Sequence, residues 1–492
     1  MIFELNTFIL LLVCILSALF GLFFSKNNLS VSSYLNAGRS IKSKSLTASI
    51  VASCFGVWIL IGPAEAATWG GMGAILGYAL GQACPYLAMI TFGERLRSIM
   101  PNGNSLTQFV FARYGKKMLK IILLLSLFYM FVYLCAEVTA IAKVTNLITG
   151  LPLWKTSLLI LVTTLIYTLK GGLRISILTD KIQFIIILIF LIFIFYFLFF
   201  SGTINISFDL IQSKASNLIS LNYFYGYTAG LTFFIAVFAT NLFDQGVWQR
   251  IFAANSTYDL KAGFRNSFLI ILPVILILGF CGIVAISLVR VDDPSTIIFS
   301  LLLGQGGKYI SSIVLVLALT LVISSMDTLI NAISSLLVID GSKFIKYNLK
   351  ITHLNFSRII LVLVSIIVFY IASKGLSVLY MFLLADLLCC AAAIPVFYGM
   401  FKDDTNEHVS IMAIFSGLLA GLMLFPDMSF QKSILVGLLL DVELFPVWIS
   451  SALLFWSFVF ATFIPLAVII LGRNNNNKFD FRKIKALIIE IK

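Results

Sequence analysis

The chain has 492 residues, of which 60% are hydrophobic and only 11% are charged. Soluble domains carry about 25% charged residues, so this composition excludes a large soluble domain and predicts a helical membrane protein. The formal net charge of +13 would favour a nucleic-acid partner in a soluble chain. In a membrane protein we interpret this net charge as the basic excess of cytoplasmic loops. We therefore expect the chain to be embedded in a lipid bilayer and to bind no nucleic acid.

Thirteen apolar stretches follow one another along the chain. Each is long enough, or nearly so, to cross a hydrocarbon core of about 30 Å at about 1.5 Å per helical residue. They lie near residues 6–24, 45–68, 72–93, 117–149, 154–170, 181–200, 223–242, 263–289, 307–340, 355–373, 376–400, 409–425 and 445–472. The pattern predicts an all-α polytopic membrane protein with short loops.

The basic residues divide unequally between the two sides that these stretches define. All but seven of the 34 Lys and Arg residues fall on one side when the loops are assigned alternately. The exceptions are Lys143, Lys155, Lys214, Arg290, Lys308, Lys374 and Lys432. Because cytoplasmic loops carry the Lys/Arg excess, we expect the N-terminus outside and the C-terminus in the cytoplasm, in a bacterial inner or plasma membrane.

The sequence offers few groups for covalent chemistry. Its seven cysteines lie inside apolar stretches without the spacing of a metal site or a disulfide framework, and it has only two histidines. We find no Ser/His/Asp set and no phosphate-binding glycine loop. We therefore predict that the protein is not an enzyme and uses no organic cofactor.

Two of the apolar stretches are interrupted by residues that weaken a helix. The second contains Gly62 and Pro63, and the seventh contains Gly226 and Gly230 and continues to Asp244. Backbone groups freed at such a break must be satisfied by an ion, a ligand or a neighbouring helix. The two stretches are five apart, as expected for inverted repeats that each begin with a broken helix. The alternative is that Gly and Pro are simply frequent in membrane helices.

Acidic residues inside the apolar stretches are costly and usually functional. Ser324, Asp327 and Thr328 in the ninth stretch share one face of a helix. This oxygen-rich patch suits a hard cation such as sodium, although serines can also bond to their own helix. Asp180 is a second candidate, for which capping the start of a helix is the alternative. The remaining candidates are Glu65, Glu137 and Asp244.

Three motifs resemble the sodium:solute symporter family, which includes proline, sugar, sialic-acid and urea transporters. They are Tyr167–Arg174 (YTLKGGLR) with Thr179, Asp180 and Gln183; Asn241–Arg250 (NLFDQGVWQR); and Ser324 and Ser325 with Asp327. The resemblance covers about residues 30–400. It implies a leucine-transporter-type fold of about 13 transmembrane helices, with a five-plus-five inverted-repeat core, one helix before it and two after. The implied organisation is an N-terminal helix and loop (1–44), a transport core (45–400) made of repeats 45–200 and 223–400, two accessory helices (401–472) and a basic cytoplasmic tail (473–492).

The resemblance also implies sites for the coupling ion and the solute. A sodium ion would bind the carbonyl groups of Ala52, Phe55 and Leu321 and the hydroxyl groups of Ser324 and Ser325. A possible second ion site has Asp180, Ser324, Asp327 and Thr328; Asp327 replaces a serine of some members, and the site could instead carry a proton. The solute would contact Cys54, Trp58, Tyr78, Gln82, Thr240 and Asn241. Proline carriers have an acidic residue at the position of Cys54, and for the aromatic residues ordinary packing is the alternative.

These features predict a sodium-coupled secondary active symporter that imports a small polar organic solute by alternating access. One alternative is a proton-coupled symporter of the urea or polyamine type, because Pro101–Thr107 and Ala112–Gly115 resemble that branch of the family. The alternatives outside secondary transport are a passive channel and a solute-binding membrane sensor.

Overall fold

The computed structural model describes residues 2–24, 36–202, 208–220, 222–289, 293–305, 309–341, 353–430, 432–436, 445–473 and 478–488. Within these ranges the chain is built from helices, and its only β-structure is two isolated bridges. The all-helical prediction is confirmed. The basic loop 343–350 and the asparagine run 474–477 lie outside the described residues.

The long helices follow the predicted apolar stretches in order. They are α1 (Ile2–Phe24), α3 (Ser43–Cys54), α4 (Gly62–Ile99), α6 (Lys116–Thr149), α7 (Leu153–Phe200), α9 (Phe224–Asn241), α11 (Thr257–Leu288), α13 (Ile310–Ile339), α14 (His353–Ser373), α15 (Val378–Phe401), α16 (Glu407–Leu424) and α19 (Leu453–Leu471). Shorter elements are η1 (Ala37–Arg39), η2 (Val57–Leu60), α5 (Leu106–Tyr114), α8 (Phe208–Ile219), α10 (Gln245–Ala253), η3 (Pro294–Thr296), α12 (Ile297–Gln305), α18 (Val447–Ser450) and α20 (Arg482–Leu487). In the described part of the chain nine helices are long and apolar enough to cross a membrane, or ten if α8 and α9 form one bent span, so the count of thirteen is not reached by this measure.

The fifth and sixth predicted stretches lie in one continuous helical segment, α7. Thr164 in its first half contacts Met326 of α13, and Asp180 in its second half contacts Ser324 of the same helix. A straight helix would separate Thr164 from Asp180 by about 24 Å. Helix α7 must therefore bend sharply between them, which brings both apolar stretches against α13.

Both apolar stretches that the sequence predicts to be interrupted are broken, although Gly226 and Gly230 lie within α9 and not at its break. Helix α3 ends at Cys54, Phe55 and Gly56 leave the helical conformation, and the chain resumes as η2 and α4. Helix α9 ends at Asn241, and α10 begins at Gln245 after a short turn. Both breaks lie beside the same cavity, so the interruptions serve to build a site.

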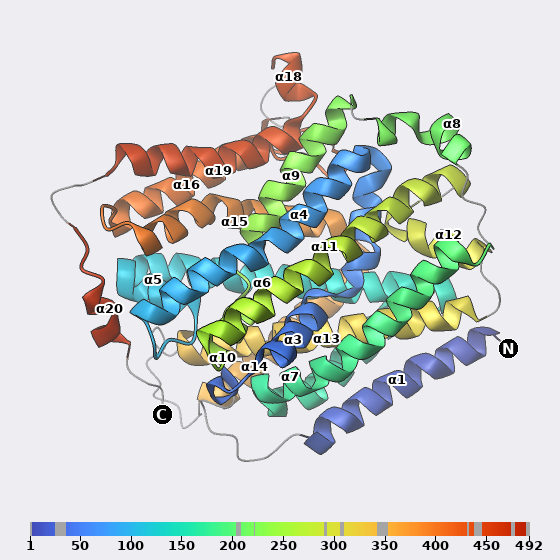
Figure 1. Cartoon of the computed structure of the whole chain (residues 1–492), viewed down its shortest axis with the longest axis horizontal. Helices are drawn as coiled ribbons and strands as arrows, with labels where there is room; N and C mark the ends of the chain where they lie inside the picture. Colours follow the sequence, from blue (N-terminus) through green and yellow to red (C-terminus); the bar gives the residue numbers. More distant parts are fainter. Residues whose placement is uncertain are drawn as a thin grey trace.

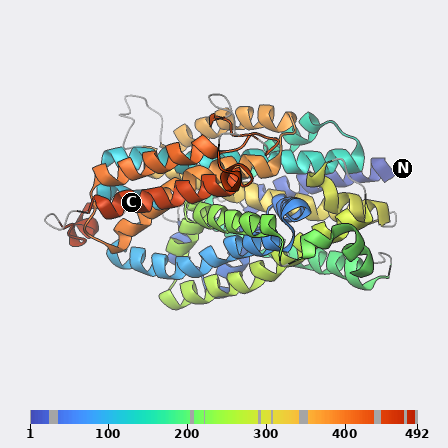
Figure 2. The same ribbon diagram turned by 90° about the horizontal axis from the view of Figure 1, so that it is seen from above.

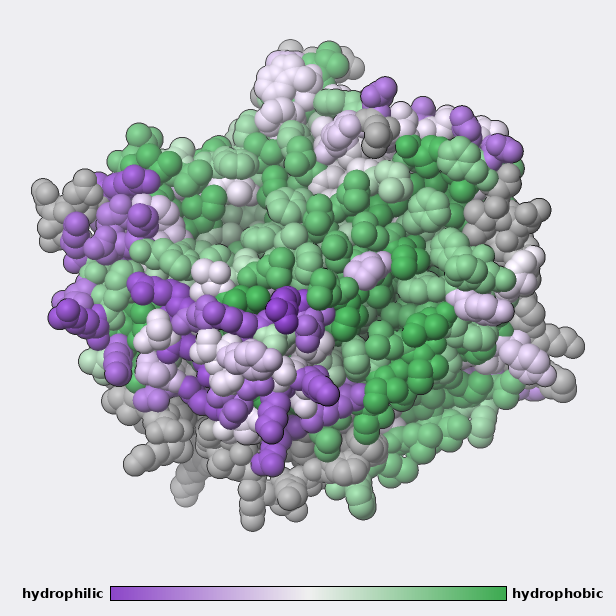
Figure 3. All heavy atoms as spheres, in the orientation of Figure 1, coloured by the Kyte–Doolittle hydropathy of each residue, from purple (hydrophilic) through white to green (hydrophobic). Residues whose placement is uncertain are grey.

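The helices run along one common direction, with their ends gathered at two opposite faces (Figure 1). Seen from above, α4, α9 and α11 lie together on one side, and α15, α16 and α19 lie together on the other (Figure 2). The surface shows a broad hydrophobic belt, with most hydrophilic residues collected at one end (Figure 3). Helix α1 begins at the end of the bundle opposite to α20 (Figure 1).

At the hydrophilic end, buried or half-buried arginines connect neighbouring segments through hydrogen bonds. Arg39 donates to the carbonyl groups of Pro101 and Gly103. Arg113 donates to the carbonyl of Gly399, and its guanidinium lies 4.3 Å from the ring centre of Phe479 in the C-terminal tail. The described part of the tail therefore packs on the protein at this end.

Candidate functional site

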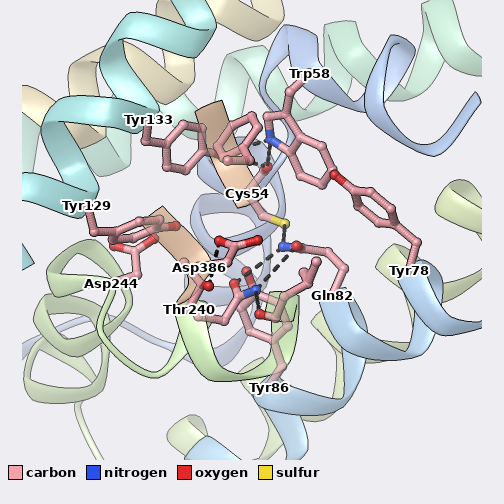
Figure 4. A pocket seen from close by; sticks show the side chains of 13 residues that line it. Cys54, Trp58, Tyr78, Gln82, Tyr86, Tyr129, Tyr133, Thr240, Asp244 and Asp386 are labelled. Carbon is pink, nitrogen blue, oxygen red and sulfur yellow. Dashed lines mark hydrogen bonds between the residues drawn. The ribbon is translucent and has the colours of Figure 1, made fainter. Parts of the chain in front are cut away.

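All six residues predicted to contact the solute line a single cavity in the middle of the bundle (Figure 4). They come from the first broken helix, from α4 and from the end of α9, beside the second break. The free volume is about 40 Å³, which is room for a few water molecules. The lining residues are Cys54, Trp58, Tyr78, Gln82, Tyr86, Tyr129, Tyr133, Val237, Thr240, Asn241, Asp244, Phe382 and Asp386.

Hydrogen bonds hold several of these side chains in place. The amides of Gln82 and Asn241 donate to each other at 3.3 and 3.2 Å. The Gln82 amide nitrogen also lies 3.1 Å from the Cys54 sulfur. The indole nitrogen of Trp58 donates to the hydroxyl of Tyr133 at 2.9 Å. These contacts join the two broken helices to α4 and α6 and hold the cavity wall in place.

The cavity is also lined by two acidic residues that were not predicted from the sequence to contact the solute. Asp244 caps α10, accepting a hydrogen bond from the backbone of Gly246 at 2.7 Å. Asp386 lies within the apolar helix α15 and accepts a hydrogen bond from the Thr240 hydroxyl at 2.6 Å. Asp386 was missed altogether, although a carboxylate inside the apolar stretch 376–400 is the same signal that identified Asp327.

A row of aromatic rings separates this cavity from a larger one of about 570 Å³, which contains Glu65 and Trp69. The ring centres of Trp58 and Tyr78 are 5.8 Å apart, those of Tyr78 and Phe233 5.0 Å, and those of Phe233 and Trp69 5.6 Å. The larger cavity opens at the end of the bundle that is opposite to the arginine-rich end. The aromatic row closes the inner cavity toward that side.

Of the predicted sodium ligands, Ala52 and Phe55 lie at the break between α3 and η2, whereas Leu321, Ser324 and Ser325 lie in α13, and Ser324 donates to Asp180. The Gly56 amide bonds to Cys54 instead of Ala52. As a result, no described residue donates a hydrogen bond to the carbonyl of Ala52 or of Phe55. Helix α13 packs against both α3 and η2 and presents Ser325 toward this break. The free carbonyls and the serine hydroxyls are the oxygen ligands that a hard cation requires.

Glu137 of α6 is a further member of this group that the sequence analysis did not assign to it. Its carboxylate accepts hydrogen bonds from the backbone of Val57 at 2.9 Å and from the hydroxyl of Ser325 at 2.9 Å. A Cβ atom at position 56 would overlap this carboxylate, so glycine at this position lets Glu137 reach the break. Glu137 therefore places a carboxyl group at the break, next to the candidate ion ligand Ser325.

The residues of the predicted second ion site divide into two groups. Asp180 forms a buried ion pair with Arg250 at 2.9 Å and accepts a hydrogen bond from Ser324 at 3.0 Å. Arg250 also donates to the hydroxyl of Thr328 at 3.1 Å and, through its Nε, to Ser49 at 2.9 Å. Arginine thus supplies the positive charge between Asp180 and Thr328, and it joins α10 to α3, α7 and α13.

Asp327 lies apart from this network. One of its oxygens accepts a hydrogen bond from Asn331 at 3.1 Å, and the other is buried without a hydrogen-bond partner among the described residues. The hydroxyls of Thr168 and Ser176 in α7 lie nearby and are also without partners there. A buried carboxylate in this state requires a cation or a proton.

These features together define a class of protein. Two interrupted helices that flank a polar cavity midway through a membrane-spanning bundle are the architecture of leucine-transporter-type secondary transporters. The chain belongs to the sodium:solute symporter family, whose family model matches residues 34–417.

The comparisons with individual proteins agree with this assignment. A spermidine transporter of Candida albicans is 26% identical over 421 residues, covering 84% of this chain and 78% of that protein. The urea active transporter of Saccharomyces cerevisiae is 24% identical over 504 residues, covering 94% and 67%. The structure of a Na+-coupled sialic acid symporter in a substrate-bound outward-open state has a TM-score of 0.71 at 16% identity, covering 95% and 96% of the two chains. That likeness shows a common fold. The curated relatives are eukaryotic and give no support to a bacterial membrane.

Proposed function

We propose that the protein is a sodium-coupled secondary active symporter that imports a small polar organic solute by alternating access. The observation that carries this proposal is the pairing of two features at the first broken helix. On one side of the break lie the free carbonyls of Ala52 and Phe55 with Ser325 and Glu137; on the other side lies the solute cavity, which Cys54 and Trp58 help to form. One segment would thus contact both ligands.

Coupling follows from this shared segment. A sodium ion held by Ala52, Phe55, Leu321, Ser324 and Ser325 would tie α3 to α13 and offset the charge of Glu137. It would thereby favour one arrangement of the broken helix, and Trp58 and Cys54 would take up the positions that contact the solute. Because an ion shifts a conformational equilibrium only by its differential affinity for the two states, a site built across a moving interface is suited to this role.

The second candidate is a proton-coupled symporter of the urea or polyamine type. It is supported by Asp327, whose unpartnered oxygen is buried, and by the names of the urea and spermidine transporters among the relatives. Asp327 would bind and release the proton. Asp180 is less suited to that role, because Arg250 already compensates its charge.

The organisation proposed for the whole chain has the arginine-rich end in the cytoplasm. The core would comprise the inverted repeats 45–200 and 223–400, each beginning with one of the two broken helices. The larger cavity with Glu65 would then face outward and form the entrance to the solute site. Helices α16 and α19 would be accessory, and the tail would be cytoplasmic.

Solute uptake into proteoliposomes distinguishes the two candidates. Wild-type protein is supplied with labelled urea, amines and amino acids under an inward sodium gradient, or a pH gradient in sodium-free medium with potassium. The proposal predicts uptake above equilibrium only with sodium. Glu137→Gln, which keeps the hydrogen-bonding shape and removes the charge, should weaken the sodium dependence. Uptake driven equally by the pH gradient without sodium, and abolished by Asp327→Asn, would establish the proton-coupled alternative.

A further inference from the structure

The charge balance of the central cavity identifies the kind of solute. Among the described residues that line it there is no Lys, Arg or His, whereas Asp244 and Asp386 both contribute carboxylates. Asp244 has a structural role as the cap of α10. Asp386 has none: it lies in the middle of an apolar helix, is only 4% exposed and receives one hydrogen bond among the described residues, from Thr240. A carboxylate at such a depth is normally paired with a positive charge.

The remaining wall of the cavity favours an organic cation over a metal ion. Six of its lining residues are aromatic: Trp58, Tyr78, Tyr86, Tyr129, Tyr133 and Phe382. Ring faces attract ammonium groups and pack against methylene groups. A sodium ion needs oxygen ligands on all sides, whereas Trp58, Val237 and Phe382 make part of this wall apolar. The Tyr133–Phe382 pair, with ring centres 5.2 Å apart, and the Trp58–Phe382 pair at 6.2 Å form an apolar side of the cavity, and Phe382 lies one turn from Asp386 in α15.

We infer that the transported solute is a small aliphatic amine that carries positive charge at neutral pH, with its ammonium group bound by Asp386 and its carbon chain against Trp58 and Phe382. Figure 4 shows Asp386 and Thr240 pointing toward the middle of the ring of side chains, with Asp244 and Tyr129 beside them. A second ammonium group of the solute would bind Asp244. The free volume of about 40 Å³ favours a small solute.

This inference rests on the proposed transport function and names the class of solute. It also accounts for the amide pair of Gln82 and Asn241: their carbonyl oxygens provide further acceptors for an N–H group, and each amide is held by the other. The outer cavity has the same character, with Glu65 beside the ring of Trp69. An amine would therefore meet a carboxylate and an aromatic face at both stages of entry.

The test compares 1,4-diaminobutane with 1,4-butanediol, an uncharged molecule of the same length. Ligand binding is measured on purified protein in detergent as the shift of the thermal unfolding midpoint, at constant ionic strength and with sodium present. The diamine should raise the midpoint in a saturable manner and the diol should not. Asp386→Asn should weaken diamine binding about 10- to 100-fold, the loss of a charged hydrogen-bond partner. Asp293→Asn removes a half-exposed carboxylate outside the cavity and should leave binding unchanged.

Uptake of the same labelled compounds into proteoliposomes separates this inference from the proposed function. If sodium drives accumulation of urea or another neutral solute while the diamine neither binds nor is transported, the amine inference is wrong and the symporter proposal stands. If the diamine binds but no gradient causes any solute to accumulate, transport is refuted and the binding site is retained. Equal binding of the diol and the diamine by wild-type protein would overturn the inference even if Asp386→Asn failed to fold.

Discussion

Ser325 stands where the candidate sodium site meets the first broken helix. Its hydroxyl donates to Glu137 at 2.9 Å and lies 3.1 Å from the carbonyl of Val322 in its own helix. Ser325→Ala removes one oxygen ligand and leaves a helix-favouring residue. We expect the sodium concentration for half-maximal uptake to rise about 10- to 100-fold, by analogy with a hydrogen bond to a charged group worth about 1.5–3 kcal/mol.

A matched control is available for this substitution. Ser365 of α14 is also a buried serine, and among the described residues its hydroxyl bonds only to the carbonyl of Leu361 one turn earlier. Ser365→Ala should leave the sodium dependence unchanged in the same uptake assay. If the two variants behave alike, Ser325 only bonds to its own helix and is not an ion ligand.

The buried ion pair of Asp180 and Arg250 should contribute strongly to the stability of the protein. Breaking a buried pair from one side costs about 3–5 kcal/mol, because the other charge is left uncompensated. Asp180→Asn and Arg250→Gln should therefore each lower the thermal unfolding midpoint of the purified protein markedly. The double variant should lose less than the sum of the two.

An ion pair at the surface serves as the control for this buried pair. Lys261 and Glu94 are 2.9 Å apart but largely accessible to solvent, and such pairs contribute about 0–1 kcal/mol. Glu94→Gln should hardly shift the midpoint. Additive losses in the Asp180 and Arg250 variants would contradict the pairing seen in the structure.

For single residues of the candidate site, the sequence predicts which residues take part better than it predicts which residues they contact. The run from Ser324 to Thr328 placed hydroxyls and Asp327 on one helix face, because helix geometry is local. It could not show that Arg250, from α10, neutralises Asp180, nor that Glu137 reaches the break at Gly56. Those contacts join helices that are distant in the chain, and no local periodicity encodes them.

Helices α4 and α9 approach each other closely enough for their glycines to touch the opposite backbone. A side chain at Gly77 would overlap the carbonyl of Gly230, and one at Gly73 would overlap that of Gly226. Small residues four apart on both helices permit this packing in the absence of a hydrophobic driving force. Because α4 and α9 carry Gln82 and Asn241, their contact sets the width of the cavity.

Gly77→Ala should therefore destabilise the protein by about 1–3 kcal/mol, the usual cost of overpacking, and lower its uptake rate. Gly304→Ala in α12 places the same methyl group where no atom lies within 4 Å and should be tolerated. The comparison is made by thermal unfolding of the two purified variants. A tolerated Gly77→Ala would mean that α4 and α9 are farther apart than the structure places them.

Element boundaries were largely predictable because long apolar stretches and helix breakers are strong signals. Both breaks fall in the stretches predicted to be interrupted; they follow Cys54 and Asn241, whereas Gly226 and Gly230 lie within α9. The sequence separates the two halves of α7 as the stretches 154–170 and 181–200, although the helix is continuous and its bend is inferred from the contacts of Thr164 and Asp180 with α13. The short helices α8, α10 and α12 lie in segments that the sequence assigns to loops, because short helices give a weak periodic signal.

At the scale of the whole molecule, the distribution of charge predicts the orientation in the membrane. Single cysteines replacing exposed residues at the two ends test it: Ser429, beside the larger cavity, and Lys485, in the tail. In intact cells a membrane-impermeant maleimide should label Ser429→Cys and should label Lys485→Cys only after permeabilisation. The unmodified chain is the control, because six of its seven cysteines are buried. Labelling of Lys485→Cys in intact cells would reverse the topology.

We propose that the solute and sodium cross the membrane together. Proteoliposomes containing the purified protein are loaded with equal sodium inside and outside, and an inward gradient of the transported solute is imposed while labelled sodium is followed. Coupling is reciprocal, so the account predicts that the solute gradient drives net sodium uptake, and that Ser325→Ala but not Ser365→Ala reduces it. Solute that equilibrates across the membrane without moving sodium would contradict the account.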